Sequence, residues 1–487
     1  MLEIMKYRQS CLYLCLIGLF CFSIPLAGEE EKQERFTIMG LGDSITEGSD
    51  YFTCYLFPLW QKLFTAGYQF DFIGPRESKC RIGTLSHCGF SGKNVEFLDF
   101  KIDSIYRLYP ADIVLLHAGH NHFVKERPIP EMIAAYKSII SKIQAINPAA
   151  YILVAQVITS GKLPKYSYIP ELNRKIAEMV SELNSAHVCL VNQAEGFDWQ
   201  KYTIHDKVHP NKEGAEKMAA VWFNALKKVL APSEVTFSPE IIQYKTLENA
   251  DSLTLHIFKP QGIKTREKKP AIVYFFGGGW KLGTPIQFYR ECAYYASKGM
   301  VAVSVDYRIE YLHHSTPFDS FADAKDAIRW IRKHATAYQI DPERIAVAGG
   351  SAGGHLAAAL GTVGSDEVVS ADYRPNLSVL YYSVIDMVSR GYGFPEITRD
   401  FEAISPIHHI TKNSPSTLIL LGTKDPIMPV KAVESYRDKL LQKGVDCDLH
   451  LFEGAGHPIF LYRKPLTNDY YKVRQLTDDF LKRYGFL

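Results

Sequence analysis

Two serines in the chain stand in short glycine-containing turns, each directly after a largely apolar run. Ser44 lies in GDSIT at 42–46, after residues 36–41, and Ser351 lies in GGSAG at 349–353, after residues 345–348. A serine between a buried strand and a helix presents its hydroxyl at the carboxyl edge of an α/β sheet, where ligands bind. Both serines are therefore candidate nucleophiles. The alternative is a turn whose serine only caps a helix.

Alternating strand and helix patterns fill the first half of the chain. Strands are expected at 36–41, 111–118, 151–157 and 187–191. Helices are expected at 131–146, 170–184 and 212–230. Alternation of this kind predicts a doubly wound parallel sheet with helices on both faces.

The second half repeats this organisation after an alternating hairpin. Strands are expected at 241–246, 253–258, 271–276, 300–306, 344–348, 377–383, 417–421 and 447–452. A long amphipathic helix is expected from 318 to about 338, with Ala327 and Ile328 facing inward and Asp323 and Lys325 facing outward. The fold class is therefore α/β, with two doubly wound sheets in tandem.

Length and composition agree with a multidomain globular protein. The 487 residues are enough for two or three domains, and we expect one at 29–230, a linker at 231–240 and another at 241–487. A hydrophobic content of 47% and a charged content of 22% are ordinary for globular chains. The net charge of +2 gives no reason to expect a nucleic-acid partner.

Residues 1–28 have the layout of a signal peptide. Lys6 and Arg8 precede an apolar run at 11–27, and a polar stretch follows at 29–35. The run is short for a membrane anchor, the alternative interpretation, and it lacks a basic flank on its far side. We therefore expect a secreted or periplasmic protein with no membrane partner once the signal is removed.

The cysteines allow one disulfide prediction. In an oxidising compartment, Cys80 and Cys88 could close a loop, whereas Cys189, Cys292 and Cys447 lie in apolar runs or helices and are expected to be buried thiols. No spacing of cysteines or histidines indicates a metal site, and no cofactor is expected.

Four blocks of the first half resemble the SGNH (GDSL-like) hydrolase family, whose sheet is flavodoxin-like. The blocks are GDS at 42–44, HCGFSG at 87–92, GHN at 119–121 and DKVH at 206–209. The resemblance implies that Ser44 is the nucleophile, His209 the general base and Asp206 the residue that orients it. It also implies an oxyanion hole made by the backbone N–H groups of Ser44 and Gly92 and the side-chain amide of Asn121.

Two details of these blocks bear on substrate and geometry. The segment from His87 to Gly92 resembles one found in carbohydrate O-acetylesterases of the same family. The family usually has Asp or Asn after the oxyanion-hole asparagine, where this chain has His122. The hydrogen bonds around that position are therefore expected to differ.

The second half resembles the α/β-hydrolase fold, in particular the hormone-sensitive-lipase-like and feruloyl/acetylxylan-esterase-like branch. The shared blocks are GGGW at 277–280, DYR at 306–308, DAIRW at 326–330, GGSAG at 349–353, GTKDP at 422–426 and GH at 456–457. The resemblance implies Ser351 as nucleophile, His457 as general base and Asp425 as the orienting acid, in the family's chain order. Backbone N–H groups of Gly278, Gly279 and Ala352 would form the oxyanion hole.

One position in this half departs from the branch. Phe276 stands where a histidine usually precedes the three glycines and braces the loop. We therefore expect altered loop geometry with the catalytic groups retained. Other histidines, such as His355, His408 and His409, are expected to be structural or surface groups.

Together these features predict an exported bifunctional carbohydrate esterase. Its substrate would be an acetylated polysaccharide such as acetylxylan, with the second site taking other acetyl groups or feruloyl groups. Two alternatives remain open. The second half also suits a prolyl-oligopeptidase-like peptidase, or one half could be a non-catalytic glycan-binding module, for which Phe276 makes the second half the better candidate.

Overall fold

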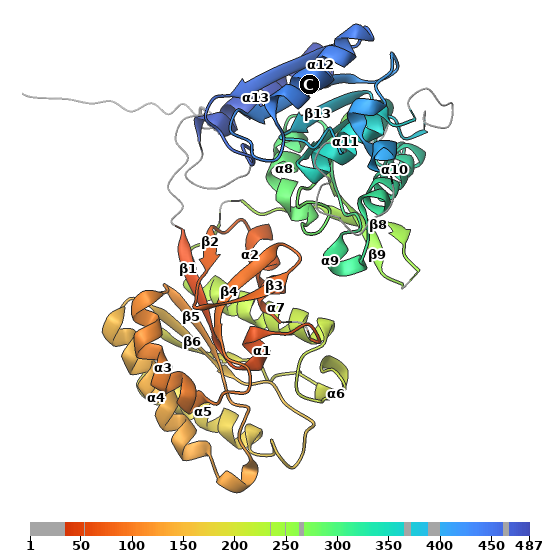
Figure 1. Cartoon of the computed structure of the whole chain (residues 1–487). Helices are drawn as coiled ribbons and strands as arrows, with labels where there is room; N and C mark the ends of the chain where they lie inside the picture. Colours follow the sequence, from red (N-terminus) through yellow and green to blue (C-terminus); the bar gives the residue numbers. More distant parts are fainter. Residues whose placement is uncertain are drawn as a thin grey trace, which may run out of the picture.

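The computed structural model describes residues 35–52, 54–233, 235–248, 250–262, 267–364, 372–387, 400–460 and 467–487. They form two α/β units, each with its own sheet (Figure 1). The expected export signal at 1–28 lies outside the described residues. Within those residues, no helix combines the length and the apolar character needed to cross a bilayer.

The first sheet is mixed, with a parallel centre. Its strands are β1 (Phe36–Gly42), β2 (Phe70–Phe72), β3 (Arg76–Cys80), β4 (Gly83–Gly89), β5 (Ile113–His117), β6 (Tyr151–Gln156) and β7 (Val188–Asn192). The order is β3-β4-β1-β5-β6-β7, and β2 also pairs with β1. All pairs are parallel except the β3–β4 hairpin. The parallel alternation was predicted, whereas the strands β2, β3 and β4 were not.

Helices cover both faces of this sheet because each carries one apolar stripe. Helices α2 (Leu56–Thr65) and α7 (Lys212–Val229) pack on one face, over one hydrophobic core. Helices α3 (Val95–Leu108), α4 (Ile129–Ile146) and α5 (Ile169–Leu183) pack on the other, over a second core. The short helices are α1 (Ser44–Glu47), η1 (Val124–Glu126) and α6 (Trp199–Tyr202).

The second sheet has eight strands in the order β15-β14-β13-β12-β10-β11-β9-β8. Their bounds are β8 (Glu240–Thr246), β9 (Ser252–Phe258), β10 (Lys269–Phe275), β11 (Val301–Val305), β12 (Ile340–Gly350), β13 (Leu377–Tyr381), β14 (Ser416–Gly422) and β15 (Cys447–Phe452). The strands β10 to β15 are parallel, and the predicted hairpin β8–β9 adds an antiparallel edge.

Helices again lie on both faces of the second sheet (Figure 1). On one face, α8 (Tyr289–Ser297) and α13 (Asn468–Arg483) are joined by a hydrogen bond from the Tyr295 hydroxyl to Asp478 at 3.0 Å. On the other face, α10 (Pro317–Lys333) packs against α11 (Ala352–Thr362). The remaining helices are η2 (Pro285–Phe288), α9 (Glu310–His313), η4 (Phe401–Ile404), η5 (Pro406–His408) and α12 (Val430–Gln442).

Helix α10 differs from its prediction in two respects. It ends at Lys333 rather than near residue 338, because the chain leaves helical geometry at His334, whose ring bonds the Trp330 carbonyl at 2.8 Å. Asp323, predicted to face outward, is fully buried. It accepts charged hydrogen bonds from Arg308 at 2.8 Å and from Lys245 at 2.7 Å. A buried carboxylate is tolerated there because two cations reach it.

The predicted loop closure between Cys80 and Cys88 is wrong, since both are free, buried cysteines. Cys80 pairs with Gly83 at one end of the β3–β4 hairpin. Cys88 lies five positions further along β4, about 17 Å away at the rise of a strand. A disulfide requires Cα atoms within about 7 Å, so the hairpin geometry excludes the bond. Of the cysteines expected to be buried thiols, Cys292 is fully buried, and Cys189 and Cys447 are partly buried.

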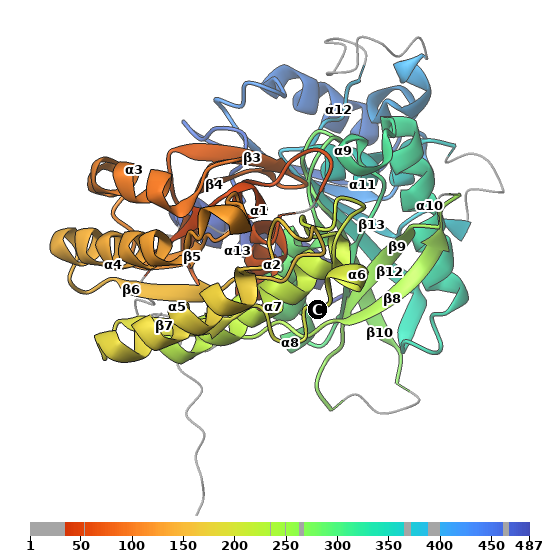
Figure 2. The same ribbon diagram turned by 90° about the horizontal axis from the view of Figure 1, so that it is seen from below.

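The two units touch each other through the hairpin and through the segment that joins them. The turn of the β3–β4 hairpin lies beside α9 of the second unit in both views (Figures 1 and 2). The Tyr311 hydroxyl on α9 donates to the Lys79 carbonyl at 3.2 Å. In the joining segment, the Phe237 N–H donates to Thr65 at 2.8 Å, and its buried ring packs edge-on against Tyr289. The joining segment therefore packs on both units.

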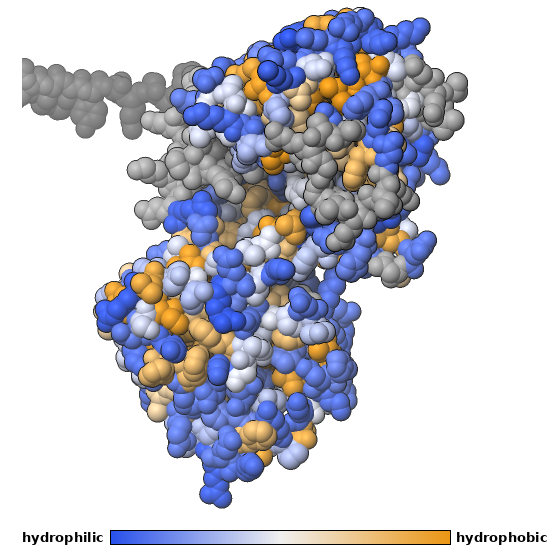
Figure 3. Space-filling view, viewed as in Figure 1, coloured by the Kyte–Doolittle hydropathy of each residue, from blue (hydrophilic) through white to orange (hydrophobic). Residues whose placement is uncertain are grey.

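The visible surface is largely hydrophilic, with smaller apolar areas (Figure 3). On α3, Phe100 and Leu108 are each 76% exposed. Isolated apolar side chains of this kind are common on soluble proteins and do not by themselves indicate a site.

Candidate active sites

Ser44, His209 and Asp206 form a continuous hydrogen-bonded line in the first unit. The Ser44 hydroxyl lies 2.8 Å from Nε2 of His209, and Nδ1 of His209 lies 2.5 Å from Oδ2 of Asp206. A carboxylate only accepts, so Nδ1 carries the proton and Nε2 is free to accept from the serine. This is the tautomer that a general base requires.

Local structure fixes the orientation of the Asp206 carboxylate and the His209 ring. Oδ1 of Asp206 accepts the backbone N–H groups of Val208 and His209 at 2.9 and 3.0 Å, which leaves Oδ2 for the imidazole. Burial acts to raise the pKa of Asp206, but hydrogen bonds from His209 and from these backbone groups outweigh it and lower the pKa. Phe52 stacks on the His209 ring at 4.0 Å between centroids and restricts its rotation.

Asp43 holds the turn on which Ser44 sits. Its Oδ1 caps α1 by accepting the Ile45 N–H at 3.0 Å, and its side chain is fully buried. Burial raises the pKa of Asp43 to about 6, against a hydrogen bond from Ile45 and the charge of His209, which lower it. Oδ2 has no hydrogen-bond partner among the described residues, and Nδ1 of His120 lies 3.9 Å away. Burial also holds the pKa of His120 well below 6.5, so His120 supplies no positive charge to Asp43.

The three predicted oxyanion-hole groups lie on adjoining loops after β1, β4 and β5. Asn121 adopts a left-handed backbone with φ of 70°, and its Nδ2 donates to the Lys93 carbonyl at 3.0 Å. This bond ties the Asn121 loop to the Gly92 loop and leaves the second amide hydrogen of Asn121 available. Among the described residues, the N–H groups of Ser44 and Gly92 have no acceptor. Unpaired donors of this kind suit a developing negative charge.

His122 and His87 brace this region from outside the triad. His122 bonds Glu96 at 2.9 Å and Glu126 at 3.0 Å, and the Glu96 bond raises the pKa of His122. His87 is fully buried, with Nδ1 accepting the Gly89 N–H at 3.0 Å and Nε2 bonded to Ser78 at 2.8 Å. Burial lowers the pKa of His87 to about 4, so this histidine stays neutral and structural.

Ser351, His457 and Asp425 form the same arrangement in the second unit. The Ser351 hydroxyl lies 2.9 Å from Nε2 of His457, and Nδ1 of His457 lies 2.7 Å from Oδ2 of Asp425. Oδ1 of Asp425 accepts the backbone N–H groups of Ile427 and Met428 at 2.7 and 3.0 Å. The Asp425 side chain is completely buried, whereas that of Asp206 is 28% exposed. The second triad is therefore better shielded from water.

The turn that carries Ser351 is strained and tightly enclosed. Ser351 has a φ of 54°, a left-handed conformation that costs a non-glycine residue free energy and is typical of a nucleophile at a strand-to-helix turn. A Cβ on Gly353 would lie 2.0 Å from the Phe275 carbonyl oxygen, and one on Gly349 would lie 2.4 Å from the Gly353 oxygen. Only glycine allows these backbone segments to come so close.

The glycine loop after β10 lies directly against Ser351. A Cβ on Gly277 would be 3.3 Å from Cβ of Ser351. The Gly277 N–H is held by the Gln287 side chain at 2.6 Å. Among the described residues, the N–H groups of Gly278, Gly279 and Ala352 have no acceptor. The structure thus brings the three predicted oxyanion-hole donors to the loop and helix end beside the nucleophile.

Phe276 is accommodated by an aromatic contact. Its ring stacks on Tyr307 at 4.0 Å between centroids and 12° between planes, and the Tyr307 hydroxyl donates to the Phe276 carbonyl at 2.6 Å. Aromatic stacking therefore braces the loop at the position where the hormone-sensitive-lipase-like branch of α/β-hydrolases has a histidine. His355 is fully buried and bonds the Ile404 carbonyl at 2.8 Å, which agrees with a structural role.

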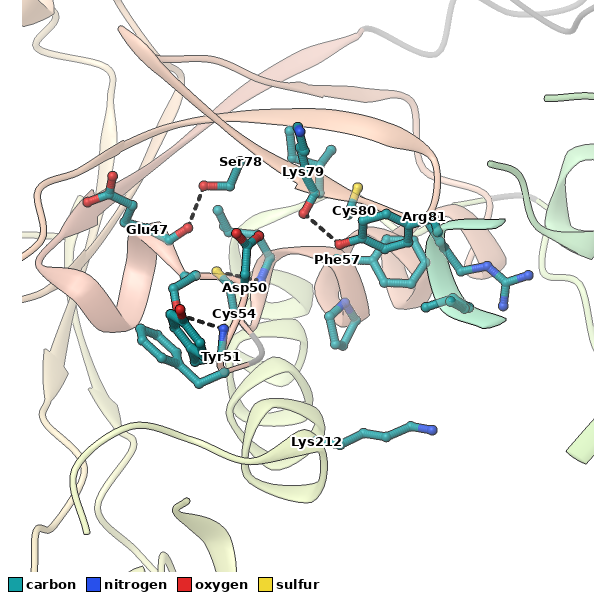
Figure 4. Close-up of a pocket in the computed structure, with 18 of the residues that line it drawn as sticks. Glu47, Asp50, Tyr51, Cys54, Phe57, Ser78, Lys79, Cys80, Arg81 and Lys212 are labelled. Atoms are coloured by element: carbon teal, nitrogen blue, oxygen red, sulfur yellow. Dashed lines mark hydrogen bonds between the residues drawn. The ribbon is translucent and has the colours of Figure 1, made fainter. Parts of the chain in front are cut away.

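A cavity of about 940 Å³ is lined by residues of both units (Figure 4). Phe52, which stacks on His209, is part of its wall. The first unit also contributes Asp50, Tyr51 and Lys212, and the second contributes Tyr311 and His314. The volume is in the range of ligand-binding clefts, and its walls combine aromatic rings with both signs of charge.

Some residues near the first site could not be identified from the sequence. Phe52 follows the nucleophile by eight residues without a recognisable motif, and the cavity joins segments more than 250 residues apart. Asp43 was visible beside Ser44, but its burial depends on packing across the sheet. Only the three-dimensional arrangement identifies these groups as neighbours of the site.

Each unit therefore has a serine at a strand end, an imidazole within hydrogen-bond distance and a carboxylate behind it, which define the class of serine hydrolases. Comparison with known families agrees. The GDSL-like Lipase/Acylhydrolase family matches residues 41–217, and the BD-FAE family matches residues 255–399. The chain joins a GDSL-like lipase/acylhydrolase domain to an α/β-hydrolase esterase domain, and both predicted resemblances are confirmed.

Individual relatives cover part of the chain. Esterase LipC of Mycobacterium tuberculosis is 31% identical over 38% of this chain and 51% of that protein. An acetylxylan esterase of Xylanibacter ruminicola is 26% identical over 41% of this chain and 44% of that protein. The chain spans about half the length of the curated relatives it matches. The thermophilic esterase Est2 of Thermogutta terrifontis, with propionate bound, is 36% identical over 51% of this chain and 95% of that chain, with a TM-score of 0.48.

Proposed function

We propose that this protein is an exported carbohydrate esterase with two serine sites. It removes O-acetyl groups from a plant polysaccharide such as acetylxylan, and its second site takes acetyl groups at other positions or feruloyl groups. The observation that carries the proposal is the pair of Ser–His–Asp lines, with serine-to-imidazole distances of 2.8 and 2.9 Å.

At each site the proposed chemistry is acyl transfer through serine. The serine Oγ forms a bond to the ester carbonyl carbon while the imidazole Nε2 takes the hydroxyl proton, and the carbonyl electron pair moves onto oxygen. The unpaired N–H groups hold that oxyanion. When the carbonyl re-forms, the carbon–oxygen bond to the sugar breaks, and the imidazole returns its proton to the sugar alcohol. Water then releases the acid by the same steps.

Three observations support a carbohydrate substrate. The relatives include an acetylxylan esterase, at 26% identity. The segment from His87 to Gly92, which resembles carbohydrate O-acetylesterases, lies beside the first site. The cavity whose wall includes Phe52, the ring stacked on His209, offers aromatic faces together with polar groups for hydroxyls. Export, suggested by residues 1–28, would bring the enzyme to such a polymer.

Acetate release from acetylated xylan tests the proposal. We expect Ser44→Ala and Ser351→Ala each to lose part of the activity and the double variant to lose at least about a thousandfold, because each serine is the nucleophile of its site. A double variant that keeps full activity would refute the assignment.

Two further measurements separate the alternatives. A fluorophosphonate probe should label both serines, whereas a non-catalytic glycan-binding domain would stay unlabelled. Turnover of aminoacyl-proline amides faster than turnover of esters would favour the peptidase alternative for the second domain.

A further inference from the structure

Arg81 is the residue through which the first domain reaches the second active site. It forms, with Ile82, the turn between β3 and β4, and its side chain extends from the hairpin on the side of the second domain (Figure 4). Its Nη2 bonds the Asp306 carboxylate at 2.7 Å, and its Nε donates to the Gly283 carbonyl at 2.8 Å. In return, the Gly283 N–H donates to the Arg81 carbonyl at 2.5 Å.

These contacts are shielded from water. The Arg81 and Asp306 side chains are 14% and 13% exposed. In an ion pair so little exposed to water, each charge depends on its partner, because removing one partner leaves the other charge with little hydration. Exposed ion pairs on the same hairpin differ, since the Arg76 side chain, which pairs with Glu47 within the first domain, is 45% exposed.

Gly283 is the closing residue of the oxyanion loop. Its φ is 120°, and a Cβ there would lie 2.3 Å from the Phe276 ring and 2.5 Å from the Gly277 carbonyl oxygen. The loop is closed by bonds from the Lys281 and Leu282 N–H groups to the Gly278 carbonyl, at 3.1 and 3.0 Å. Whatever fixes Gly283 therefore fixes the glycines that carry the oxyanion-hole N–H groups.

We infer that Arg81 is a positioning residue for the oxyanion hole of the Ser351 site, supplied by the other domain. Within the described residues Arg81 has no hydrogen bond to Ser351; it acts on that site through Gly283, and so on Gly278 and Gly279, and it also lines the cavity beside the first triad. The second site then works at full rate only while the first domain is docked against it. This inference rests on the proposed ester hydrolysis at Ser351.

The test measures the second site alone, in a Ser44→Ala background, with p-nitrophenyl acetate. Adding Arg81→Ala should lower kcat by about 10- to 100-fold, the range expected when oxyanion donors are misplaced. KM should change less than about threefold, because Arg81 acts through the loop at Gly283 and the expected effect falls on the oxyanion of the transition state. Arg81→Lys, which keeps a cation near Asp306 but loses the Nε bond to Gly283, should recover part of the loss. Arg76→Ala is the matched control in the same hairpin and should leave kcat within about twofold.

A transition-state analogue separates positioning from general damage. Binding of a trifluoromethyl ketone to the Ser351 site should weaken in parallel with kcat/KM across the Arg81 variants, because both depend on the oxyanion donors. An Arg81→Ala enzyme with kcat and analogue affinity within twofold of the parent would overturn the inference. Equal losses at the Ser351 and Ser44 sites would also overturn it, since they indicate a defect of the whole fold. A Ser44→Ala parent that hydrolyses no ester contradicts the proposed function itself.

Discussion

At the residue scale, the two triads differ mainly in how much water reaches their carboxylates. In both, Oδ1 accepts two backbone N–H groups and Oδ2 faces the imidazole. Asp425 is completely buried, whereas Asp206 is 28% exposed. The same substitution should therefore have different consequences at the two sites.

We predict that Asp425→Asn lowers kcat of the second site by about 10⁴-fold. The backbone N–H groups of Ile427 and Met428 will keep the amide oxygen on their side, so the NH₂ group faces His457 and imposes the wrong tautomer. Asp206→Asn should cost the first site less, because water can reach its imidazole. Steady-state kinetics in Ser44→Ala and Ser351→Ala backgrounds measures the two losses, and a larger loss for Asp206→Asn would contradict this explanation.

Asp43 predicts a pH dependence of stability. Its pKa in the folded protein is about 6, against 3.8 as the reference value. Between these pH values the folded state holds a proton on Asp43 that the unfolded state has released. The contribution of protonated Asp43 to the stability of the fold is therefore complete below about pH 3.8 and is lost as the pH rises through 6. The shift corresponds to about 3 kcal/mol. Relative to wild type, Asp43→Asn should therefore become more stable between pH 4 and pH 7, as measured by urea unfolding. A difference that stays constant with pH would rule out this role for Asp43.

At the element scale, the turn between β12 and α11 depends on the absence of side chains. We predict that Gly353→Ala lowers the free energy of unfolding of the second domain by about 2–3 kcal/mol, because its Cβ would meet the Phe275 and Phe276 carbonyl oxygens at 2.0 and 2.4 Å. Backbone atoms cannot move aside as a flexible side chain can. Gly456→Ala is the control, since a Cβ there has no neighbour within 4 Å. Equal midpoints in denaturant for the two variants would count against this explanation.

Elements with strong apolar periodicity were predictable, and polar edge elements were not. The central strands β1, β5, β10 and β12 each contain an apolar run because both faces of the sheet are covered, and these runs could be located from the sequence. Strand β12 begins at Ile340, before its predicted start at 344, because the residues that follow Ile340 are mostly polar and give no apolar signal. The strand β3 reads RESKC and lies at the sheet edge, where no hydrophobic pattern is required. The prediction for Asp323 was wrong for a related reason, because the cations that pair with it, Arg308 and Lys245, come from other parts of the chain. The triad residues could be named from motifs, but their supporting contacts could not.

At the scale of the whole molecule, the cavity beside the first triad has walls from both domains. Tyr311 belongs to the second domain, yet it lines this cavity and bonds the hairpin of the first. A polymer that is cleaved at Ser44 and extends into this cavity would contact both domains, whereas a small ester would contact only the first.

We predict that Tyr311→Ala raises KM of the first site for acetylated xylo-oligosaccharides by about 3- to 10-fold, the value of one aromatic contact. KM for p-nitrophenyl acetate should stay the same, because that ester is too small to reach the second domain. Assays in a Ser351→Ala background provide the measurement. Tyr471→Ala, which removes a 46% exposed tyrosine of α13 outside the cavity, is the matched control. Equal changes in KM for the oligosaccharide and for p-nitrophenyl acetate would show that the cavity is not part of the substrate-binding site.

The buried contact of Arg81 with Asp306 and Gly283 also determines how this protein can be taken apart. Cutting the chain in the segment that joins the domains would leave a C-terminal fragment whose Asp306 carboxylate has lost the Arg81 cation. The Gly283 backbone N–H and carbonyl groups would then have to hydrogen-bond with water. Such a fragment is expected to fold with a less ordered glycine loop after β10 and to hydrolyse esters more slowly than the intact enzyme. Grafting the C-terminal half onto another protein would require the Arg81 turn to be transplanted with it. The two halves are distinct folds, but they are not modules that can be exchanged independently.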